Sequence, residues 1–212
     1  VVIGSSNVTL QGLSMHSSPD YSIDVVSSNN FKLYGSYLNT DPTGLMPRFN
    51  EAGLGLVRIV NSDNVEIGGE QAARRNVLSW CKESCILAEG TSGQTTDNLV
   101  IKGNNIGVGS DSVTDQGGIG TGILLKQGTV DAIIGGDSSL GAGNNIMNCL
   151  LGGIGLHDDE DTTILGNRIL SNSIVSNDPY FAGIFIGGST NTLIGDGTVN
   201  GRNIISGTSH KS

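Results

Sequence analysis

The sequence predicts an all-β protein, a parallel β-solenoid, and three observations carry that prediction. Glycine supplies 33 of the 212 residues and asparagine 20, whereas only 15% of the residues are charged. Glycine and asparagine are poor helix formers, so this composition disfavours helical bundles and coiled coils. Short runs of Val, Ile and Leu recur along the whole chain at a nearly constant period. Such a repeat is typical of coils that stack and share one core.

The clearest repeat is a polar residue followed by three residues of a short apolar segment. Its seven copies end at Leu10, Leu33, Ile67, Ile101, Ile134, Ile164 and Ile194, in steps of 23, 34, 34, 33, 30 and 30 residues. Apolar segments upstream of these copies cover residues 23–25, 57–59, 86–88, 123–125, 154–156 and 184–186. Downstream segments cover residues 76–78, 105–107, 145–147, 168–170 and 203–205. Three short strands per repeat predict one coil, so the chain is expected to form about seven coils.

The long connections between strands alternate between two places in successive coils. Those between the second and third strands cover residues 69–75, 136–143 and 196–202. Those after the third strand cover residues 39–55, 109–122 and 171–183. The coils are therefore expected to pair into a larger unit of about 60–68 residues, repeated about three times.

Glycine and asparagine are expected at the corners between strands. Glycine fits corners that need a positive φ or leave no room for a side chain. Asparagine recurs just before the repeated segment, where side-chain amides are predicted to stack and hydrogen-bond along the tube. The residues predicted to form this ladder are Asn30, Asn64, Asn98 and Asn191.

The charge and length of the chain exclude several classes of partner. The net charge is −9 and only 11 residues are Lys or Arg, so no nucleic-acid partner is expected. No apolar run approaches the roughly 18 residues that a membrane-spanning helix needs. The chain begins Val1-Val2-Ile3 without Met or a signal peptide. We therefore expect residues 1–212 to be a single domain and a segment of a longer chain.

Two longer motifs resemble the pectate-lyase-like right-handed parallel β-helix superfamily, in particular the repeat arrays of large bacterial surface and secreted proteins. Residues 64–69 read Asn-Val-Glu-Ile-Gly-Gly and precede Arg75-Asn76-Val77-Leu78-Ser79. Residues 191–195 read Asn-Thr-Leu-Ile-Gly and precede Arg202-Asn203-Ile204-Ile205-Ser206. The resemblance covers essentially all 212 residues and implies a right-handed helix of parallel strands. It does not settle function, because the superfamily holds lyases, hydrolases, epimerases, phage tailspikes and non-catalytic adhesins.

If the chain were a polysaccharide enzyme, the resemblance implies active groups on an outward sheet face. The candidates are Glu89, Lys126, His157 and Asp158, which are expected to lie within about 5–10 Å of one another because neighbouring strands are about 4.8 Å apart. A Lys or His base beside acidic residues suits β-elimination of a uronate. The alternative, which we favour, is a solvated face that carries isolated charges.

The densest acidic run is a candidate calcium site, because carboxylate oxygens suit Ca²⁺. Its weak candidate ligands are Asp158, Asp159 and Asp161. The spacing matches no calcium loop, so a solvated turn is the favoured interpretation, and no other cofactor is expected. The three histidines, His16, His157 and His210, are scattered and predict no zinc site.

Two covalent features remain open from the sequence. Cys81 and Cys85 are close enough in sequence for a disulfide in an oxidising compartment, and unpaired buried thiols are the alternative. Asn7-Val8-Thr9 is an N-glycosylation sequon. Trp80 is expected to be a corner or core residue rather than a platform for a sugar ring.

The preferred function is a non-enzymatic extracellular or cell-surface rod that serves as a stalk, an adhesin or a building block of a filament or sheath. Its expected partners are further copies stacked end to end, or neighbouring domains of a longer chain, because neither end shows a cap. The alternative is a carbohydrate-active enzyme or glycan-binding domain that acts on acidic polysaccharide by lyase or epimerase chemistry. A domain like those of phage tailspikes is a third hypothesis.

Overall fold

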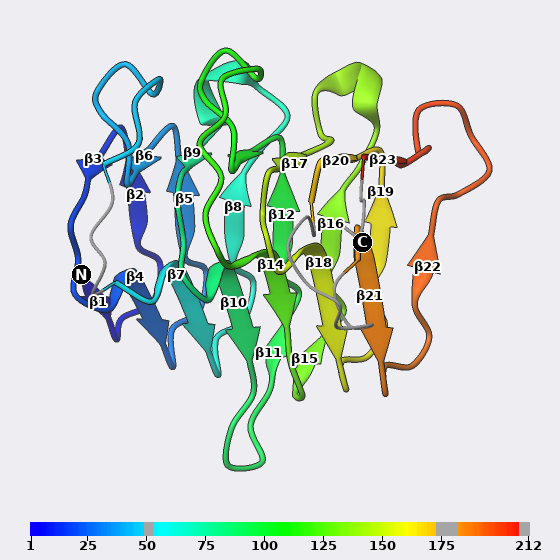
Figure 1. The fold of residues 1–212 in the computed structure, drawn as a ribbon. Coiled ribbons are helices and arrows are strands. Elements are labelled where there is room, and N and C mark those ends of the chain that lie inside the picture. Colours follow the sequence, from blue (N-terminus) through cyan, green and yellow to red (C-terminus); the bar gives the residue numbers. More distant parts are fainter. Residues whose placement is uncertain (49–52, 173–181, 208–212) are drawn as a thin grey trace.

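The computed structural model shows a parallel β-helix built from three parallel sheets (Figure 1). It describes residues 1–48, 53–172 and 182–207. The first sheet contains β1 (Val2–Ile3), β4 (Tyr21–Val26), β7 (Gly55–Val60), β10 (Ser84–Glu89), β14 (Thr121–Leu125), β18 (Gly152–His157) and β21 (Ile184–Gly187). The second contains β2 (Thr9–Gln11), β5 (Lys32–Tyr34), β8 (Glu66–Gly68), β12 (Val100–Lys102), β16 (Ile133–Gly135), β19 (Thr163–Leu165) and β22 (Leu193–Ile194).

The third sheet completes each coil. It contains β3 (Ser14–Met15), β6 (Tyr37–Leu38), β9 (Val77–Leu78), β13 (Asn105–Ile106), β17 (Asn145–Met147), β20 (Arg168–Leu170) and β23 (Ile204–Ser206). A small pair, β11 (Thr96–Asp97) and β15 (Thr129–Val130), lies at a corner, and the two 3₁₀ turns are η1 (Ala72–Arg74) and η2 (Ser138–Leu140). Within the described residues, each large sheet has seven strands, which confirms the predicted seven coils of three strands.

The register of the second sheet confirms the predicted repeat. Leu10 pairs with Leu33, and Leu33 pairs with Ile67. The ladder continues to the last copy, where Ile164 pairs with Ile194. These residues point into the tube, and the buried ones among them are fully enclosed by the coils on either side. Apolar residues at one position of every coil therefore make a single continuous core.

The predicted alignment of the third sheet is wrong by one residue in two coils. Val77 pairs with Asn105, so Asn76 aligns with Asn104. Residues 203–205 are shifted in the same way. For Asn76, the adjacent asparagines Asn104 and Asn105 leave the corner residue ambiguous in the sequence. For Asn203, the corner residue of the preceding coil is Asn167, not the Arg168 that begins its strand.

The corrected register reveals a buried asparagine ladder between the second and third sheets. Its members are Asn76, Asn104, Asn144, Asn167 and Asn203. The Asn144 Oδ1 atom accepts hydrogen bonds from the backbone N–H and the Nδ2 of Asn104, both at 3.0 Å. The Nδ2 of Asn144 donates to Asn167 Oδ1 at 2.9 Å and to the Ile101 carbonyl at 2.8 Å. Each amide thus satisfies backbone groups that the corner leaves unpaired.

The ladder that the sequence predicted at Asn30, Asn64, Asn98 and Asn191 is not formed. These four residues are exposed and have φ values of 60°, 55°, 55° and 53°. Of these four, only Asn30 forms a side-chain hydrogen bond to the neighbouring coil within the described residues, from its Nδ2 to Asn7 Oδ1 at 2.9 Å. Asparagine occupies this corner because it tolerates the left-handed conformation better than most residues.

The long connections stack on one another in alternate coils, as the paired repeat predicts. Ser110 Oγ donates to the Thr43 carbonyl at 2.8 Å, which joins the loops that follow β6 and β13. Ser138 N–H donates to the Asn200 carbonyl at 3.0 Å, which joins the loop containing η2 to the loop before β23. Residues 49–52 and 173–181 of the predicted connections lie outside the described residues. The described residues contain no helix long and apolar enough to cross a membrane.

Candidate functional site

The outward face of the first sheet carries the residues proposed for enzyme chemistry. Ala88 pairs with Leu125, and Leu125 pairs with Leu156. The residues that follow these positions, Glu89, Lys126 and His157, therefore lie at one register on three neighbouring strand ends. Side chains at one register on adjacent strands are about 5 Å apart at their bases.

Three of these candidates line one shallow hollow. Lys126, His157 and Asp158 enclose it together with Leu124, and its volume is about 380 Å³. Glu89 does not line this hollow. Among the described residues, no hydrogen bond or ion pair joins the four candidate side chains. A base without an orienting partner is a poor match to general acid–base chemistry. The catalytic assignment therefore stays a prediction.

His157 and Asp158 have structural contacts of their own. The His157 ring lies 4.8 Å from the Phe185 ring between centroids, with the planes tilted by 39°. Asp158 has a φ of 56°, and its N–H donates to the Gly187 carbonyl at 2.9 Å. Both residues thus contact the next coil at β21.

Several charged residues of the first two sheets are paired across coils. Arg58 forms a two-pronged contact with Asp24, with Nε and Nη2 at 2.8 and 2.6 Å from the two carboxylate oxygens. On the second sheet, Glu66 accepts from the Tyr34 hydroxyl at 2.5 Å and forms an ion pair with Lys32 at 3.5 Å. Burial, together with the Glu66 hydrogen bond, raises the pKa of Tyr34 to about 12. These contacts tie neighbouring coils together.

The acidic run of the predicted calcium site is divided between inside and outside. Asp158 is exposed, Asp161 is half-buried, and Asp159 is 2% exposed. Asp159 Oδ2 accepts a hydrogen bond from the Thr162 hydroxyl at 2.5 Å, whereas its Oδ1 has no partner. No three acidic, histidine or cysteine side chains of the described residues gather into a metal-binding group. The calcium site stays a prediction.

The remaining sequence features are found in separate places. His16 is exposed and contacts Ser17, whereas His210 lies outside the described residues. Asn7 of the sequon is exposed. Trp80 is a half-buried corner residue with a φ of 48°, and its carbonyl accepts from Asn39 Nδ2 at 3.1 Å.

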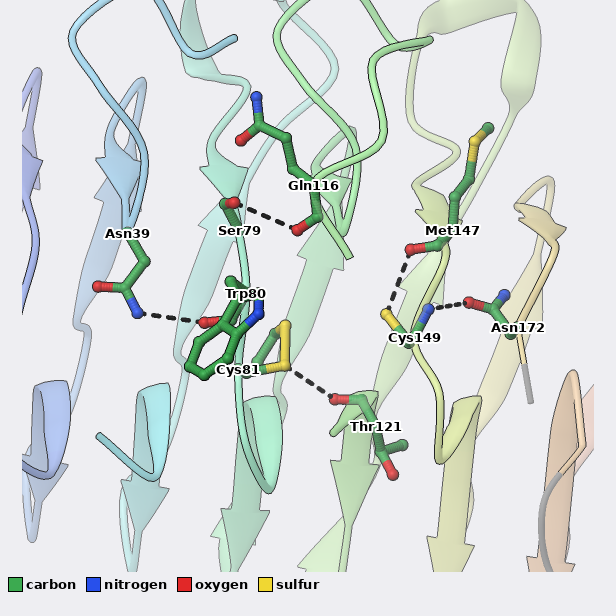
Figure 2. The surroundings of a disulfide bond; sticks show 10 residues. Asn39, Ser79, Trp80, Cys81, Gln116, Thr121, Met147, Cys149 and Asn172 are labelled. Atoms are coloured by element: carbon green, nitrogen blue, oxygen red, sulfur yellow. Dashed lines mark hydrogen bonds between the residues drawn. A yellow bond between two sulfur atoms is a disulfide. The ribbon is translucent and has the colours of Figure 1, made fainter. Parts of the chain in front are cut away.

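The structure joins Cys81 and Cys85 in a disulfide between β9 and β10, and Figure 2 shows its surroundings. The two Cα atoms are 5.1 Å apart, and the Sγ atom of Cys81 lies 3.7 Å from the Thr121 carbonyl oxygen of the next coil. Cys149 occupies a similar corner two coils further on and is a buried free thiol. Burial raises the pKa of Cys149 to about 12, which favours the thiol over the thiolate at neutral pH.

At both ends of the described tube, residues that point inward are partly exposed. In the last coil, the inward residues Ile186, Ile194 and Ile205 are 41, 44 and 47% exposed. Their equivalents one coil earlier, Leu156, Ile164 and Ile169, are all 0% exposed. At the other end, the inward residues Ile3, Leu10 and Met15 are only partly buried.

Sequence reasoning did not single out the residues of this end face. The seventh copy of each strand carries an inward apolar residue, and the described residues place no further strand beside it. Figure 1 shows β21, β22 and β23 as the last strands of their sheets. Each of them leaves one backbone edge unpaired within the described structure.

Comparisons with known proteins give no family for this chain. No family model matches it. No curated protein matches it either. Among solved structures, the chain was matched to HetL, a pentapeptide repeat protein involved in heterocyst differentiation regulation from the cyanobacterium Nostoc sp. strain PCC 7120. That match has a TM-score of 0.17 and 11% identity, and it covers 89% of this chain and 86% of that chain. At this TM-score, the match does not show a shared fold.

Proposed function

We propose that the chain is a non-enzymatic structural rod of the cell surface or extracellular space, and that it acts by stacking end to end. The exposed inward residues of the last coil carry the proposal. We further propose that the fold belongs to the pectate-lyase-like superfamily. The motifs at residues 64–69 and 75–79 support that placement, because they fall on a second-sheet strand and on the ladder corner that follows it.

The exposed isoleucines of the end face would be covered by a further coil. Full burial of one isoleucine side chain contributes about 1.5–3 kcal/mol. Covering three isoleucines that are each nearly half exposed therefore contributes about 3 kcal/mol, and the unpaired strand edges gain backbone hydrogen bonds as well. Burial of this size gives only about millimolar affinity between separate molecules. It is sufficient within one chain or on a crowded surface, where effective concentrations reach the millimolar range.

The asparagine ladder also stops at this face. In every earlier coil from Ser36 onward, the N–H at the ladder position donates to an asparagine Oδ1 of the next coil. Asn203 accepts from Asn167, but the described residues offer no acceptor for its own N–H. A further parallel coil would supply that acceptor and continue the rod.

An engineered disulfide tests the stacking in its predicted register. Thr9 and Leu193 occupy the same outward position in the first and last coils. In an end-to-end stack, they would face each other on adjacent parallel strands about 4.8 Å apart, within the range that a disulfide spans. The double variant Thr9→Cys/Leu193→Cys is therefore expected to form covalent dimers and longer chains under mild oxidation.

A matched variant controls for random collision. Val113 is 80% exposed on a loop remote from the ends, so Thr9→Cys/Val113→Cys presents the same number of free thiols without the register. Non-reducing electrophoresis should show a ladder of multimers for the first pair and monomers for the second. Equal cross-linking of both pairs, or none in either, would remove the basis for end-to-end assembly.

The second candidate function is a carbohydrate-active enzyme or glycan-binding domain for acidic polysaccharide. The hollow lined by Lys126, His157 and Asp158 favours it, because it gathers a basic and an acidic group on one face. Incubation with pectate or alginate and Ca²⁺, followed by ultraviolet absorbance of the unsaturated product, detects lyase chemistry directly. If the protein has lyase activity and Lys126→Ala or His157→Ala abolishes it, the enzyme hypothesis would replace the proposal of a structural rod.

A further inference from the structure

A second hollow, unrelated to the enzyme candidates, gathers three of the chain's 11 basic residues. Its volume is about 440 Å³, and Arg75, Arg168 and Arg202 line it without any acidic residue in the lining. It lies beside the buried asparagine ladder, between the loop that contains η2 and the loop before β23.

Three glycines, Gly141, Gly143 and Gly166, are part of the lining and leave space between the arginines. Arg75 and Arg202 each precede a ladder asparagine, and the equivalent positions between them include Gly143 and Gly166. A Cβ atom on Gly143 would lie 2.0 Å from the Gly166 carbonyl oxygen, so no side chain fits there. Arg75 Nε donates to the Gly103 carbonyl at 3.2 Å, which directs its side chain along the rod toward the hollow.

The two loops that flank the hollow are joined by hydrogen bonds of residues just outside its lining. Asn200 Nδ2 donates to Ser139 Oγ at 3.2 Å and to Asp137 Oδ2 at 3.4 Å, and thereby links the two loops. The carboxylate of Asp137 also accepts from the Ser139 N–H at 2.8 Å. The site is therefore built before any ligand arrives, which reduces the entropy cost of binding.

The guanidinium groups retain hydrogen-bonding capacity. Arg168 Nη1 donates to Asn145 Oδ1 at 3.4 Å, and Arg75 uses its Nε, but a guanidinium has five N–H donors. Among the described residues, neither these two arginines nor Arg202 forms an ion pair. By contrast, Arg58 and Arg74 do pair with carboxylates.

We propose that this hollow binds a multiply charged oxyanion, phosphate or sulfate, either free or as the ester of a small organic molecule. Arginine forks match the oxygens of these groups, and three positive charges without a counter-ion call for more than one negative charge. Val199 and Ile204, which are 73 and 51% exposed, form an apolar side against which the body of an ester can lie. A long polyanion is disfavoured, because the net charge of −9 repels it beyond the hollow.

Isothermal titration tests the proposal with inorganic phosphate, inorganic sulfate, glucose 6-phosphate, glucose 6-sulfate and neutral glucose as probes. We expect the esters to bind more tightly than the free ions, and glucose not to bind. Comparison of the phosphate and sulfate arms shows which oxyanion the site prefers. Raising NaCl from about 50 to about 500 mM should weaken binding, because ions screen charged contacts.

Charge-neutral variants decide whether the hollow is the site. Arg168→Gln and Arg202→Gln should each weaken oxyanion binding by at least about tenfold, since each removes a charge-assisted contact. Lys82→Gln removes one exposed positive charge elsewhere and should leave binding unchanged. Thermal unfolding confirms that each variant is folded. Absence of oxyanion binding, equal binding of glucose, or equal weakening by Lys82→Gln would overturn the proposal. These outcomes are independent of end-to-end stacking.

Discussion

At the scale of single residues, asparagine has two separate tasks in this protein. At the exposed corner before the second sheet, Asn64 and its equivalents adopt a positive φ, and their side chains face solvent. At the buried corner after that sheet, Asn144 is 1% exposed and makes hydrogen bonds through both side-chain atoms. The first task depends on backbone conformation, and the second depends on the amide group itself.

Substitution by glycine separates these two tasks. Asn144→Gly removes the acceptor for the Asn104 N–H and the donor for the Ile101 carbonyl. Because each buried group left unpaired costs about 1–3 kcal/mol, the free energy of unfolding should fall by about 3–5 kcal/mol. Asn64→Gly keeps a residue suited to positive φ and should cost less than about 1 kcal/mol. Urea unfolding measures both, and equal losses would contradict the assignment of the two corners.

Aspartates stabilise the loops by accepting hydrogen bonds from nearby Ser and Thr residues. The hydroxyl of Thr198 and its own N–H both donate to Asp196 Oδ1, at 2.7 and 2.8 Å. The hydrogen bond from the Thr or Ser hydroxyl has the larger effect and the bond from the backbone N–H the smaller one. Together they hold the pKa of the aspartate carboxyl below its usual value. The same arrangement occurs at Asp41, Asp111, Asp137 and Asp196.

These lowered pKa values predict that the folded protein loses stability in acid. A carboxyl whose pKa is depressed by folding contributes stability above its unfolded pKa of about 3.9, and this contribution is lost as the pH falls through the folded pKa. The urea midpoint should therefore be lower at about pH 3 than at about pH 6. In carboxyl-detected NMR titrations, Thr198→Val should raise the pKa of Asp196 toward its usual value. Thr9→Val, remote from any of these carboxyls, should not shift it.

At the scale of elements, strands of two to six residues are held mainly by their neighbours in the adjacent coils. The corner between β9 and β10 is additionally closed by the Cys81–Cys85 disulfide. A covalent loop this short removes little entropy from the unfolded chain, so it contributes about 2 kcal/mol.

Removal of this disulfide should therefore destabilise the rod only modestly. Cys81→Ala/Cys85→Ala is expected to lower the free energy of unfolding by about 2 kcal/mol. Dithiothreitol should lower the stability of the native protein by a similar amount and leave that of the variant unchanged. Urea unfolding with and without reductant makes the comparison. If dithiothreitol also lowers the stability of the variant, its effect does not come from reduction of the Cys81–Cys85 disulfide.

The first coil lacks one element of the ladder. Leu13 stands at the ladder position, where later coils carry Ser36 and then asparagines, and its N–H donates to Ser36 Oγ at 3.2 Å. In an end-to-end stack, Leu13→Asn would offer an acceptor to the Asn203 N–H of the preceding copy and a donor to that copy's Ile194 carbonyl. Because two hydrogen bonds contribute about 1 kcal/mol each, association should tighten by about tenfold or more.

Sedimentation equilibrium at several concentrations measures this change. His16→Asn is the matched control, because His16 is exposed in the same coil and away from the ladder. Association that is unchanged by Leu13→Asn, or strengthened equally by His16→Asn, would contradict the proposed continuation of the ladder.

At the scale of the whole molecule, the sequence was sufficient to predict the coils and their core. Apolar residues that recur at one position per coil have a single way to be buried together, so Ile67 and Ile101 could be aligned correctly. The ladder corner was not predictable in this way, because adjacent asparagines such as Asn104 and Asn105 differ only in which one faces inward.

The candidate sites were harder to predict than the fold. Register alone placed Lys126 beside His157, but sequence could not show whether their side chains have partners. The arginine hollow could not be predicted from the sequence, because Arg75 and Arg202 are far apart in it. Only the structure shows that they line one cavity. Whether the exposed Ile194 at the end face is covered depends on the neighbouring coil or molecule, and no local sequence motif predicts that.

Appending one coil tests most directly whether the end face is completed by another coil. Gly207 has a φ of 71°, and Asn148 at the equivalent corner has 59°, so a copy of residues 149–172 can follow Gly207 directly in place of residues 208–212. This copy places its equivalent of Asn167 next to Asn203 in the ladder. A control extension has the same sequence except for leucine at that position. We expect the asparagine extension to fold onto the rod, to raise the free energy of unfolding and to protect the Asn203 N–H from exchange. The leucine extension should do so less well. An asparagine extension that stays unfolded and leaves stability unchanged would contradict this expectation.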